Sequence, residues 1–264
     1  MEMVAASKLR HAQAQVQSAR PYFEILHTTI EDIVRTNRDF SSPYLQERPV
    51  KKVMYIVIAG DRGLAGGYNN NIVKLIAGNE ALTPEKTRVY AIGRKGRDGL
   101  AKKGYEIAED YSEVIDEPAY QDAADLTKEL LAAFGRGEIG EIYLAYTGFK
   151  NTVVHEPKPI KLLPISVEEI MKDVAIDTLT LMNFEPEADE ALDMIIPKYM
   201  NNIIYGAFVE AIASENGARM QAMDSATSNA EDMISDLTLK YNRARQGSIT
   251  QELTEIIAGA NAIE

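Results

Sequence analysis

The feature that most constrains this 264-residue chain is a long C-terminal stretch that favours helix without interruption. No proline follows Lys198, and Pro197 suits the first turn of a helix, where a backbone N–H is not needed. A helix over residues 198–262 would be about 98 Å long, whereas a compact globule of this chain length has a radius of gyration of about 18 Å. The sequence therefore predicts a helix that does not fit inside a globule. Its stripe of small and apolar residues comprises Ile204, Ala207, Ala211, Ala218, Ala222, Ala226, Ala230, Met233, Leu237, Ala244, Ile249, Leu253 and Ile256.

The N-terminal segment carries a second helical pattern, in which small or apolar residues recur at spacings that alternate between four and three. This heptad pattern lasts for four repeats and is typical of a coiled coil. Pro21 lies inside it and lacks a backbone N–H, so we expect it to kink or split the helix at a cost of about 3 kcal/mol. The positions are Ala5, Leu9, Ala12, Val16, Ala19, Phe23, Leu26, Ile30 and Ile33.

The two helices flank the central segment of the chain, so they are expected to pack as an antiparallel pair. The first ends near Asn37 and the second starts after the central segment, which places Met1 beside roughly residue 235 at equal rise per residue. Residues beyond that point lack an intramolecular partner, yet residues 256–263 carry no charge. An uncharged exposed tip implies an external apolar socket.

The central segment reads as an α/β domain with a mostly parallel sheet and an added final strand. Val53–Ala59 is a nearly continuous apolar run, typical of a strand buried on both faces. Further strands are expected at Val89–Ile92, Ile142–Tyr146 and Val153–Leu163, and helices at Asn70–Ile76, Lys95–Lys103 and Asp122–Phe134. The predicted divisions are an N-terminal helix over 1–45, an α/β domain over 46–165, an acidic, irregular connector over 166–196 and the C-terminal helix over 197–264.

Composition excludes several classes of function. The formal net charge of −12 disfavours a general nucleic-acid binder. The absence of cysteine excludes disulfides, thiolate nucleophiles and thiolate metal sites, and His11, His27 and His155 are far apart in the sequence without the HExxH spacing. We therefore expect no metal site, and we expect no secretion or membrane insertion because neither a signal peptide nor a run of about 20 apolar residues is present.

Two basic islands stand out in this acidic chain. Residues 1–20 carry a net charge of +2 and include Lys8 and Arg10, whereas residues 239–251 carry +3 and include Arg243 and Arg245. Such islands indicate either an acidic partner or solvated helix faces, and the sequence leaves both interpretations open.

The glycine-rich segment Gly60–Asn69 follows the first strand, where a nucleotide-binding loop would stand. Its glycine spacing matches neither the Rossmann fingerprint G-x-G-x-x-G nor the P-loop, and no lysine follows until Lys74. A tight turn followed by a helix start is the better interpretation. The acidic doublets of the chain lie in polar loops without an apolar wall to shift a pKa, so they are read as solvated surface.

Four motifs together resemble the gamma subunit family of the F-type ATP synthases, in the right order and over essentially the whole chain. They are MEMVAASKLR at 1–10, GDRGLAGGYN at 60–69, SENGARMQAMDSAT at 214–227 and YNRARQGSITQELTEIIAGA at 241–260. Members of the bacterial type usually begin with further residues ahead of the first motif, so the chain looks N-terminally truncated.

The resemblance implies a central rotor shaft with a central, mostly parallel α/β (Rossmann-like) domain and an antiparallel coiled coil of the two terminal helices. It implies one copy per complex, inside a ring of three alpha and three beta subunits, with the α/β domain docked on the c-ring and the epsilon subunit. The shaft would couple proton flow through the c-ring to ATP synthesis or hydrolysis. It would have no catalytic site and no cofactor, because ATP, ADP and Mg bind the alpha and beta subunits. The implied location is the cytoplasmic face of the bacterial plasma membrane, with membrane contact only through the c-ring.

The resemblance also suggests which residues contact partners. Lys8, Arg10, Arg243 and Arg245 are expected to form a basic collar around the pair of helices, opposite acidic loops of the beta subunits. A beta-subunit catch loop is expected to hold the polar residues Arg245, Gln246, Thr250 and Glu252. Above them, Ile256, Ile257 and Ile263 are expected to turn in an apolar sleeve.

Two other classes of function stay as alternatives. One is a nucleotide-binding α/β protein with helical dimerisation arms, and the other is a static coiled-coil scaffold. Neither explains the uncharged tip.

The isolated chain is predicted to bind ATP with a Kd no tighter than about 1 mM, because the loop at 60–69 lacks the lysine and hydroxyl that a phosphate site requires. Isothermal titration calorimetry with Mg-ATP measures this directly. Micromolar affinity would favour the nucleotide-binding alternative.

Overall fold

The computed structural model describes residues 1–36, 42–46, 52–116, 118–152, 154–166 and 188–261. These residues form two units, Met1–Gln221 and Ala222–Glu264. The elements are α1 (Glu2–Thr36), β1 (Val53–Ile58), α2 (Tyr68–Ala77), β2 (Thr87–Ile92), α3 (Arg94–Ala101), β3 (Glu106–Asp110), the 3₁₀ helix η1 (Ser112–Asp116), α4 (Tyr120–Gly135), β4 (Glu141–Phe149), β5 (His155–Leu163) and α6 (Ala188–Asn261). The finer domain boundaries predicted from the sequence stay predictions.

A five-stranded sheet in the order β3-β2-β1-β4-β5 lies at the centre of the first unit. The first four strands of this order are parallel, and β5 pairs antiparallel with β4. The prediction of a mostly parallel sheet with an added final strand is confirmed. Strand β3 was missed, because it is a short, acidic edge strand without a buried apolar run.

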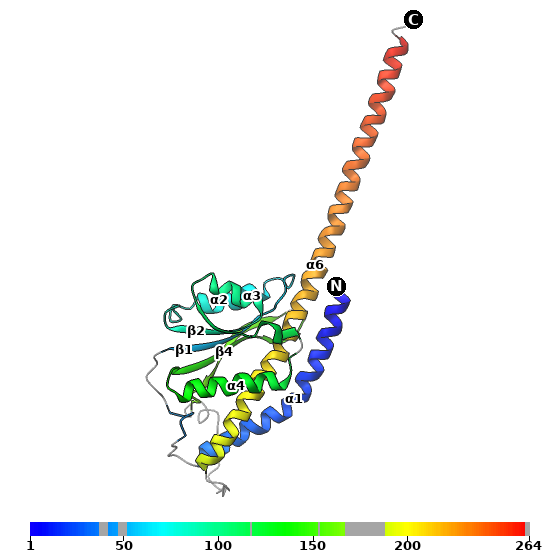
Figure 1. Ribbon diagram of the computed structural model, residues 1–264. Helices are drawn as coiled ribbons and strands as arrows, with labels where there is room; N and C mark the ends of the chain where they lie inside the picture. Colours follow the sequence, from blue (N-terminus) through cyan, green and yellow to red (C-terminus); the bar gives the residue numbers. More distant parts are fainter. Residues whose placement is uncertain (37–41, 47–51, 117, 153, 167–187, 262–264) are drawn as a thin grey trace. The chain divides into compact units, whose positions relative to one another are not determined.

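Helices cover both faces of the sheet (Figure 1). Side chains of β1 alternate between these faces, as expected for a strand. Met54, Ile56 and Ile58 pack with residues of α4, α1 and α6, whereas Tyr55 and Val57 pack with α2 and α3. The continuous apolar run of β1 therefore contributes side chains to two hydrophobic cores, one on each face of the sheet.

Helices α1 and α6 lie side by side in the first unit (Figure 1), and their contacts show that they run antiparallel. The ring of Phe23 stacks on Tyr199 with a centroid distance of 5.8 Å. The predicted coiled-coil pair is confirmed. Towards the start of α1, Leu9 and Ala12 cluster with Val209 and Ala213, and towards its end Ile30 and Ile33 share a cluster with Leu192 and Ile196.

The predicted register of this pair was wrong. Phe23 lies against Tyr199, so at equal rise per residue Met1 lies level with about residue 221 and not 235. The reason is that α6 begins at Ala188, about ten residues before the predicted start. The part of the predicted connector at 167–187 lies outside the described residues.

Both prolines lie inside helices. Pro197 was expected in the first turn, but it stands in the interior of α6, where Leu192, Ile196 and Met200 are fully buried at helical spacing. Their packing offsets the hydrogen bond that proline cannot donate. Pro21 does not split α1, which is helical from Glu2 to Thr36, although its ribbon changes direction partway along (Figure 1).

Replacing Phe208 by alanine tests the contribution of α6 to the main core. Its side chain is 1% exposed in the cluster that joins α6 to the sheet and α4. The Phe208→Ala variant is expected to lose about 3–5 kcal/mol in the free energy of unfolding, because a cavity replaces the ring. Urea denaturation followed by circular dichroism measures this. Met194→Ala on the exposed side of the same helix is the control, and an equal loss in both variants would contradict the packing described.

Candidate functional site

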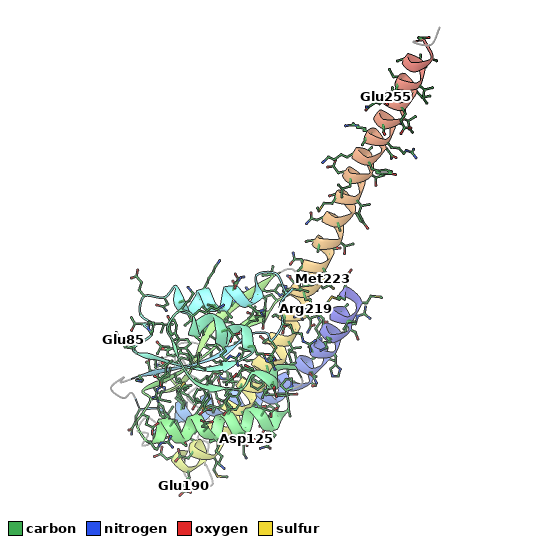
Figure 2. The ribbon with its side chains drawn as sticks, turned by 45° about the horizontal axis from the view of Figure 1, so that its top comes forward. Glu85, Asp125, Glu190, Arg219, Met223 and Glu255 are labelled. Atoms are coloured by element: carbon green, nitrogen blue, oxygen red, sulfur yellow. The ribbon has the colours of Figure 1, made fainter. Side chains whose placement is uncertain are left out.

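The second unit is a helical segment whose large apolar side chains are exposed. Almost every described side chain from 224 to 261 is exposed, and Figure 2 shows those side chains standing free along the helix as far as the labelled Glu255. Scattered exposed apolar residues are normal, but a sustained series on one helix indicates a surface that a partner covers. The series is Met233, Ile234, Leu237, Leu239, Tyr241, Ile249, Leu253, Ile256 and Ile257.

The predicted contact residues of this unit all lie on its surface. Arg243, Arg245, Gln246 and Glu252 are exposed, which leaves their charged and amide groups free to meet another chain. The hydroxyl of Thr250 donates to the backbone oxygen of Gln246 at 2.8 Å, a bond that serine and threonine often make inside helices. The partner assigned to these residues stays a prediction.

The predicted apolar tip is equally accessible. Ile256 is 67% exposed and Ile257 is 59% exposed. Both side chains lie on the last turns of the described helix. The third residue of the predicted sleeve contact, Ile263, lies outside the described residues.

The predicted basic collar stays a prediction. Lys8 and Arg10 are exposed on α1 in the first unit, whereas Arg243 and Arg245 belong to the second. Their predicted proximity depended on Met1 lying beside residue 235, and that register is wrong. Each basic pair remains an exposed charged surface of its own.

The second candidate region lies at the carboxyl ends of β1 and β4. The chain runs from β1 outward to β2 and β3 and then returns to β4 on the other side of β1. In open α/β sheets, such a reversal of strand order marks the crevice where ligands bind. Here residues 210–219 of α6 contact the segments at this crevice.

On one side of α6, the loop after β1 packs directly against the helix. Glu215 lies so close to Gly60 that a methyl group at Gly60 would come within 2.6 Å of the Glu215 Oε1 atom. Glu215 pairs with Arg219, and Arg219 donates to the backbone oxygen of Gly63 at 3.5 Å. The buried hydroxyl of Tyr68 donates to the backbone oxygen of Ala211 at 3.2 Å.

The surroundings of Tyr68 keep its hydroxyl protonated, so that it can donate a hydrogen bond. Burial raises the pKa of Tyr68 well above its ordinary value, the charge of Glu215 raises it further, and Arg219 acts in the opposite direction. The phenol therefore stays protonated at physiological pH, and its hydrogen bond to α6 does not depend on pH in that range.

On another side of α6, the two strands β4 and β5 supply the contacts. Burial raises the pKa of Tyr146, and so does the hydrogen bond that its hydroxyl donates to Glu210. A methyl group at Gly217 would come within 2.8 Å of the Cε1 atom of His155. A larger residue at 217 would require the His155 side chain to move.

The loop at 60–69 also satisfies its own polar groups. The backbone N–H of Gly60 donates to Asn69 Oδ1 at 2.8 Å, and Asn69 Nδ2 donates to the oxygen of Arg62 at 3.1 Å. Asp61 Oδ1 accepts the first N–H of α3, from Arg94, at 2.7 Å. The segment is a turn followed by the start of α2, as predicted. The carboxylate of Asp61 therefore lies at the N-terminus of α3. Helix N-termini in α/β proteins often bind an anion.

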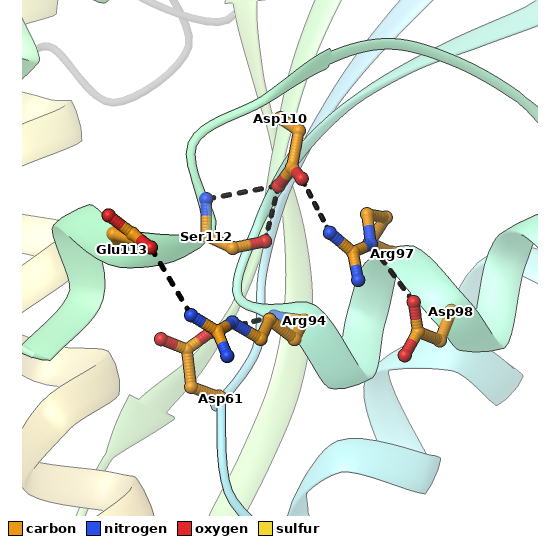
Figure 3. A network of polar contacts seen from close by, with 7 residues as sticks. All are labelled: Asp61, Arg94, Arg97, Asp98, Asp110, Ser112 and Glu113. Carbon is orange, nitrogen blue, oxygen red and sulfur yellow. Dashed lines mark hydrogen bonds and ion pairs between the residues drawn. The ribbon is translucent and has the colours of Figure 1, made fainter.

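A surface hollow of about 550 Å³ lies beside this turn (Figure 3). Its two arginines are already paired, Arg94 with Glu113 at 3.3 Å and Arg97 with Asp110 at 2.6 Å. Burial alone would raise the pKa of Asp110, but hydrogen bonds from Ser112 and the charge of Arg97 outweigh it and lower the pKa. With as many acidic as basic side chains in its lining, the hollow does not favour a phosphate ligand.

Within the described residues, no group of three or more His, Asp or Glu side chains is placed to hold a metal ion. The same residues include no helix long and apolar enough to cross a membrane.

Sequence reasoning missed the contacts between α6 and the carboxyl edge of the sheet. The available signal was Glu215 and Arg219 at a spacing of four residues inside an otherwise apolar, small-residue stretch of helix. That spacing predicts an ion pair, but nothing local in the sequence says that the loop at 60–69 covers it.

Comparison with known proteins identifies the family. The family described as ATP synthase matches residues 1–263. The ATP synthase gamma chain of Lachnoclostridium phytofermentans is 57% identical, and the alignment covers 100% of this chain and 92% of that one. The gamma chain of Alkaliphilus metalliredigens is 42% identical, and the sodium ion specific gamma chain of Acetobacterium woodii is 39% identical, each with the same coverage.

Solved structures share the fold. A central stalk and c-ring structure of the Tetrahymena thermophila mitochondrial ATP synthase contains a chain with a TM-score of 0.63 and 22% identity, covering 86% of this chain and 97% of that one. A chain of the Euglena gracilis mitochondrial ATP synthase has a TM-score of 0.64 and 17% identity, covering 98% of this chain and 95% of that one. Sequence, fold and the exposed C-terminal helix agree, and the chain belongs to the family of ATP synthase gamma chains.

Proposed function

We propose that this chain is the central shaft of an ATP synthase and transmits rotation between an ion-driven ring and the nucleotide sites of other subunits. The observation that carries the proposal is the exposed surface of residues 224–261, on which large apolar side chains stand beside charged and polar ones. The names of the relatives support the same role. The helix pair and α/β domain of the first unit supply a base on which such a shaft can stand.

A shaft needs a surface that differs around its axis, so that each orientation presents different contacts to the surrounding subunits. The second unit has this property, because apolar residues such as Ile249 and Leu253 are interspersed with Arg243, Arg245 and Glu252. Moving one charge across 100 mV releases about 2.3 kcal/mol. The contacts of the shaft must be weak on this scale, because each one breaks during a turn.

We infer that the chain has no catalytic site of its own and binds no cofactor, and that ATP, ADP and Mg bind the alpha and beta subunits. The filled crevice at the carboxyl ends of β1 and β4 supports this inference, since α6 and Asp61 lie where an α/β protein would hold a nucleotide.

The proposed partners are three alpha and three beta subunits around the second unit, with the epsilon subunit and the c-ring at the α/β domain, and one copy of this chain per complex. Membrane contact would come only through the c-ring, on the cytoplasmic face of the bacterial plasma membrane. The coupling ion, a proton in the initial expectation, would be bound by other subunits.

Replacing Arg245 and Gln246 by alanine tests the proposed catch contacts. The side chains are exposed on a continuous helix, so the double variant should keep the circular dichroism of the parent. In the assembled complex it is expected to change the ATP hydrolysis rate by about two- to tenfold, or to reduce assembly, because polar contacts worth about 1 kcal/mol each are lost. Lys103→Ala with Gln121→Ala removes the same two types of group from the surface of the α/β domain and is the control. Parent-like assembly and turnover would show that the catch assignment is wrong.

Replacing Ile256 and Ile257 by serine tests the proposed apolar sleeve. Burying an isoleucine against a partner contributes about 1.5–3 kcal/mol, so the double variant should assemble with alpha and beta subunits at least about tenfold more weakly. Size-exclusion chromatography at graded concentrations measures this. Met194→Ser, an exposed apolar residue of the first unit, should leave assembly unchanged. Equal assembly of all three proteins would contradict the sleeve.

A further inference from the structure

We propose that Glu215 and Arg219 of α6, together with Gly60, Gly63 and Tyr68 of the loop after β1, form a latch that fixes the angle of α6 relative to the α/β domain and carries torque between them. The inference rests on the proposed rotary function, and it assigns a task to residues outside the partner-binding surface. The latch residues are already joined by the contacts described above.

The apolar packing of α6 beyond Val209 offers little resistance to rotation about the helix axis. Beyond the fully buried Phe208 and Val209, the apolar residues that α6 buries are all alanines, namely Ala211, Ala213 and Ala218, and glycine at 217 meets His155. Hydrophobic contact is not directional. Alanine methyl groups are small and make few van der Waals contacts that a rotation of the helix would break. Apolar burial holds the helix against the domain, but it fixes the angle of the helix poorly.

The latch residues supply directional contacts that fix the angle of α6. Ala211, Glu215 and Arg219 are spaced by four residues, so they lie along one face of α6, and each contacts the loop at 60–68. Hydrogen bonds and ion pairs weaken steeply with misalignment. Rotating α6 by a fraction of a turn would therefore break the two hydrogen bonds, from Tyr68 to Ala211 and from Arg219 to Gly63, and would move Glu215 away from Gly60.

The ion pair lies within α6, so it acts indirectly, by holding the two side chains that contact the loop after β1. The side chains of Arg219 and Glu215 are only 15% and 11% exposed, so salt and water screen the pair less than a surface pair. Buried ion pairs contribute little net stability, because desolvation costs about as much as the attraction gains. Positioning is thus a better account of this pair than stabilising the fold: the pair directs Arg219 towards the backbone oxygen of Gly63 and Glu215 towards Gly60.

A second row of contacts opposes rotation from another direction. Glu210 accepts a hydrogen bond from Tyr146 of β4, and Gly217 lies against His155 of β5. The latch and this row hold α6 from the loop after β1 and from the β4–β5 pair. Since Ala218 is the last buried residue along α6, torque that travels down the helix from the second unit meets the latch first.

The experiment uses the complete ATP synthase complex with this chain, fixed through its beta subunits, with a bead attached to the α/β domain. The variant is Glu215→Gln with Arg219→Gln, and the angular fluctuation of the bead is recorded while catalysis is paused. We expect the angular variance to rise about twofold or more and ATP-driven ion transport per ATP hydrolysed to fall about fivefold, at the lower end of typical coupling between sites.

The matched control is Arg136→Gln with Glu138→Gln, which removes the same two groups from an ion pair on the surface of the α/β domain. A second latch variant, Glu215→Leu with Arg219→Met, keeps side-chain volume and is expected to fold at least as stably as the parent while losing the directional contacts. It should show the same rise in variance. Thermal unfolding of each isolated chain establishes that the first unit is folded.

Two failures are distinguishable. If the parent chain assembles and its bead rotates, but both latch variants fluctuate and transport like the control, the latch proposal is overturned. If the parent chain itself does not assemble or its bead does not rotate, the proposed function fails.

Discussion

The close packing of α6 against the carboxyl edge of the central sheet is the interaction on which the rest of the structure depends. In a doubly wound sheet this edge is free for a ligand, because the strand order reverses there and leaves a crevice. In this chain Glu215 fills the space beside Gly60, and Gly217 allows His155 to approach the helix. Helix α6 therefore packs where many open α/β sheets hold a ligand.

The same packing explains how two very different surfaces coexist in one helix. Up to Ala218, α6 is covered by α1, the sheet and α4, and its stripe of small residues belongs to the core. From residue 224 onward the side chains are exposed, although the apolar stripe continues. Burial in the first unit provides the stability, and the exposed stripe of the second unit is available for partners. A helix held firmly over one part of its length can carry load over the other.

Much of this could be predicted from periodicity alone. The heptads of α1 predicted Ala5, Leu9, Ala12, Ile30 and Ile33 as buried, and all five are. The apolar run at 53–59 predicted a strand buried on both faces. Predictions failed where local signals compete with tertiary packing. Pro197 appeared to start a helix, but the burial of Leu192 and Ile196 extended that helix to Ala188 and moved the register of the whole pair.

The sequence by itself determined the class of the protein, the antiparallel helix pair, the parallel sheet and the exposed uncharged tip. These features follow from hydrophobic periodicity and from the order of the elements along the chain, and both can be read from the residues. Only the tertiary structure decided that the loop at 60–69 packs against α6, that Asp61 accepts the first N–H of α3 and that Glu215 and Arg219 are buried together. The contacts between this loop and α6 join residues about 150 positions apart, and their geometry depends on how a helix crosses a sheet edge. No pattern of spacing along the chain encodes that crossing.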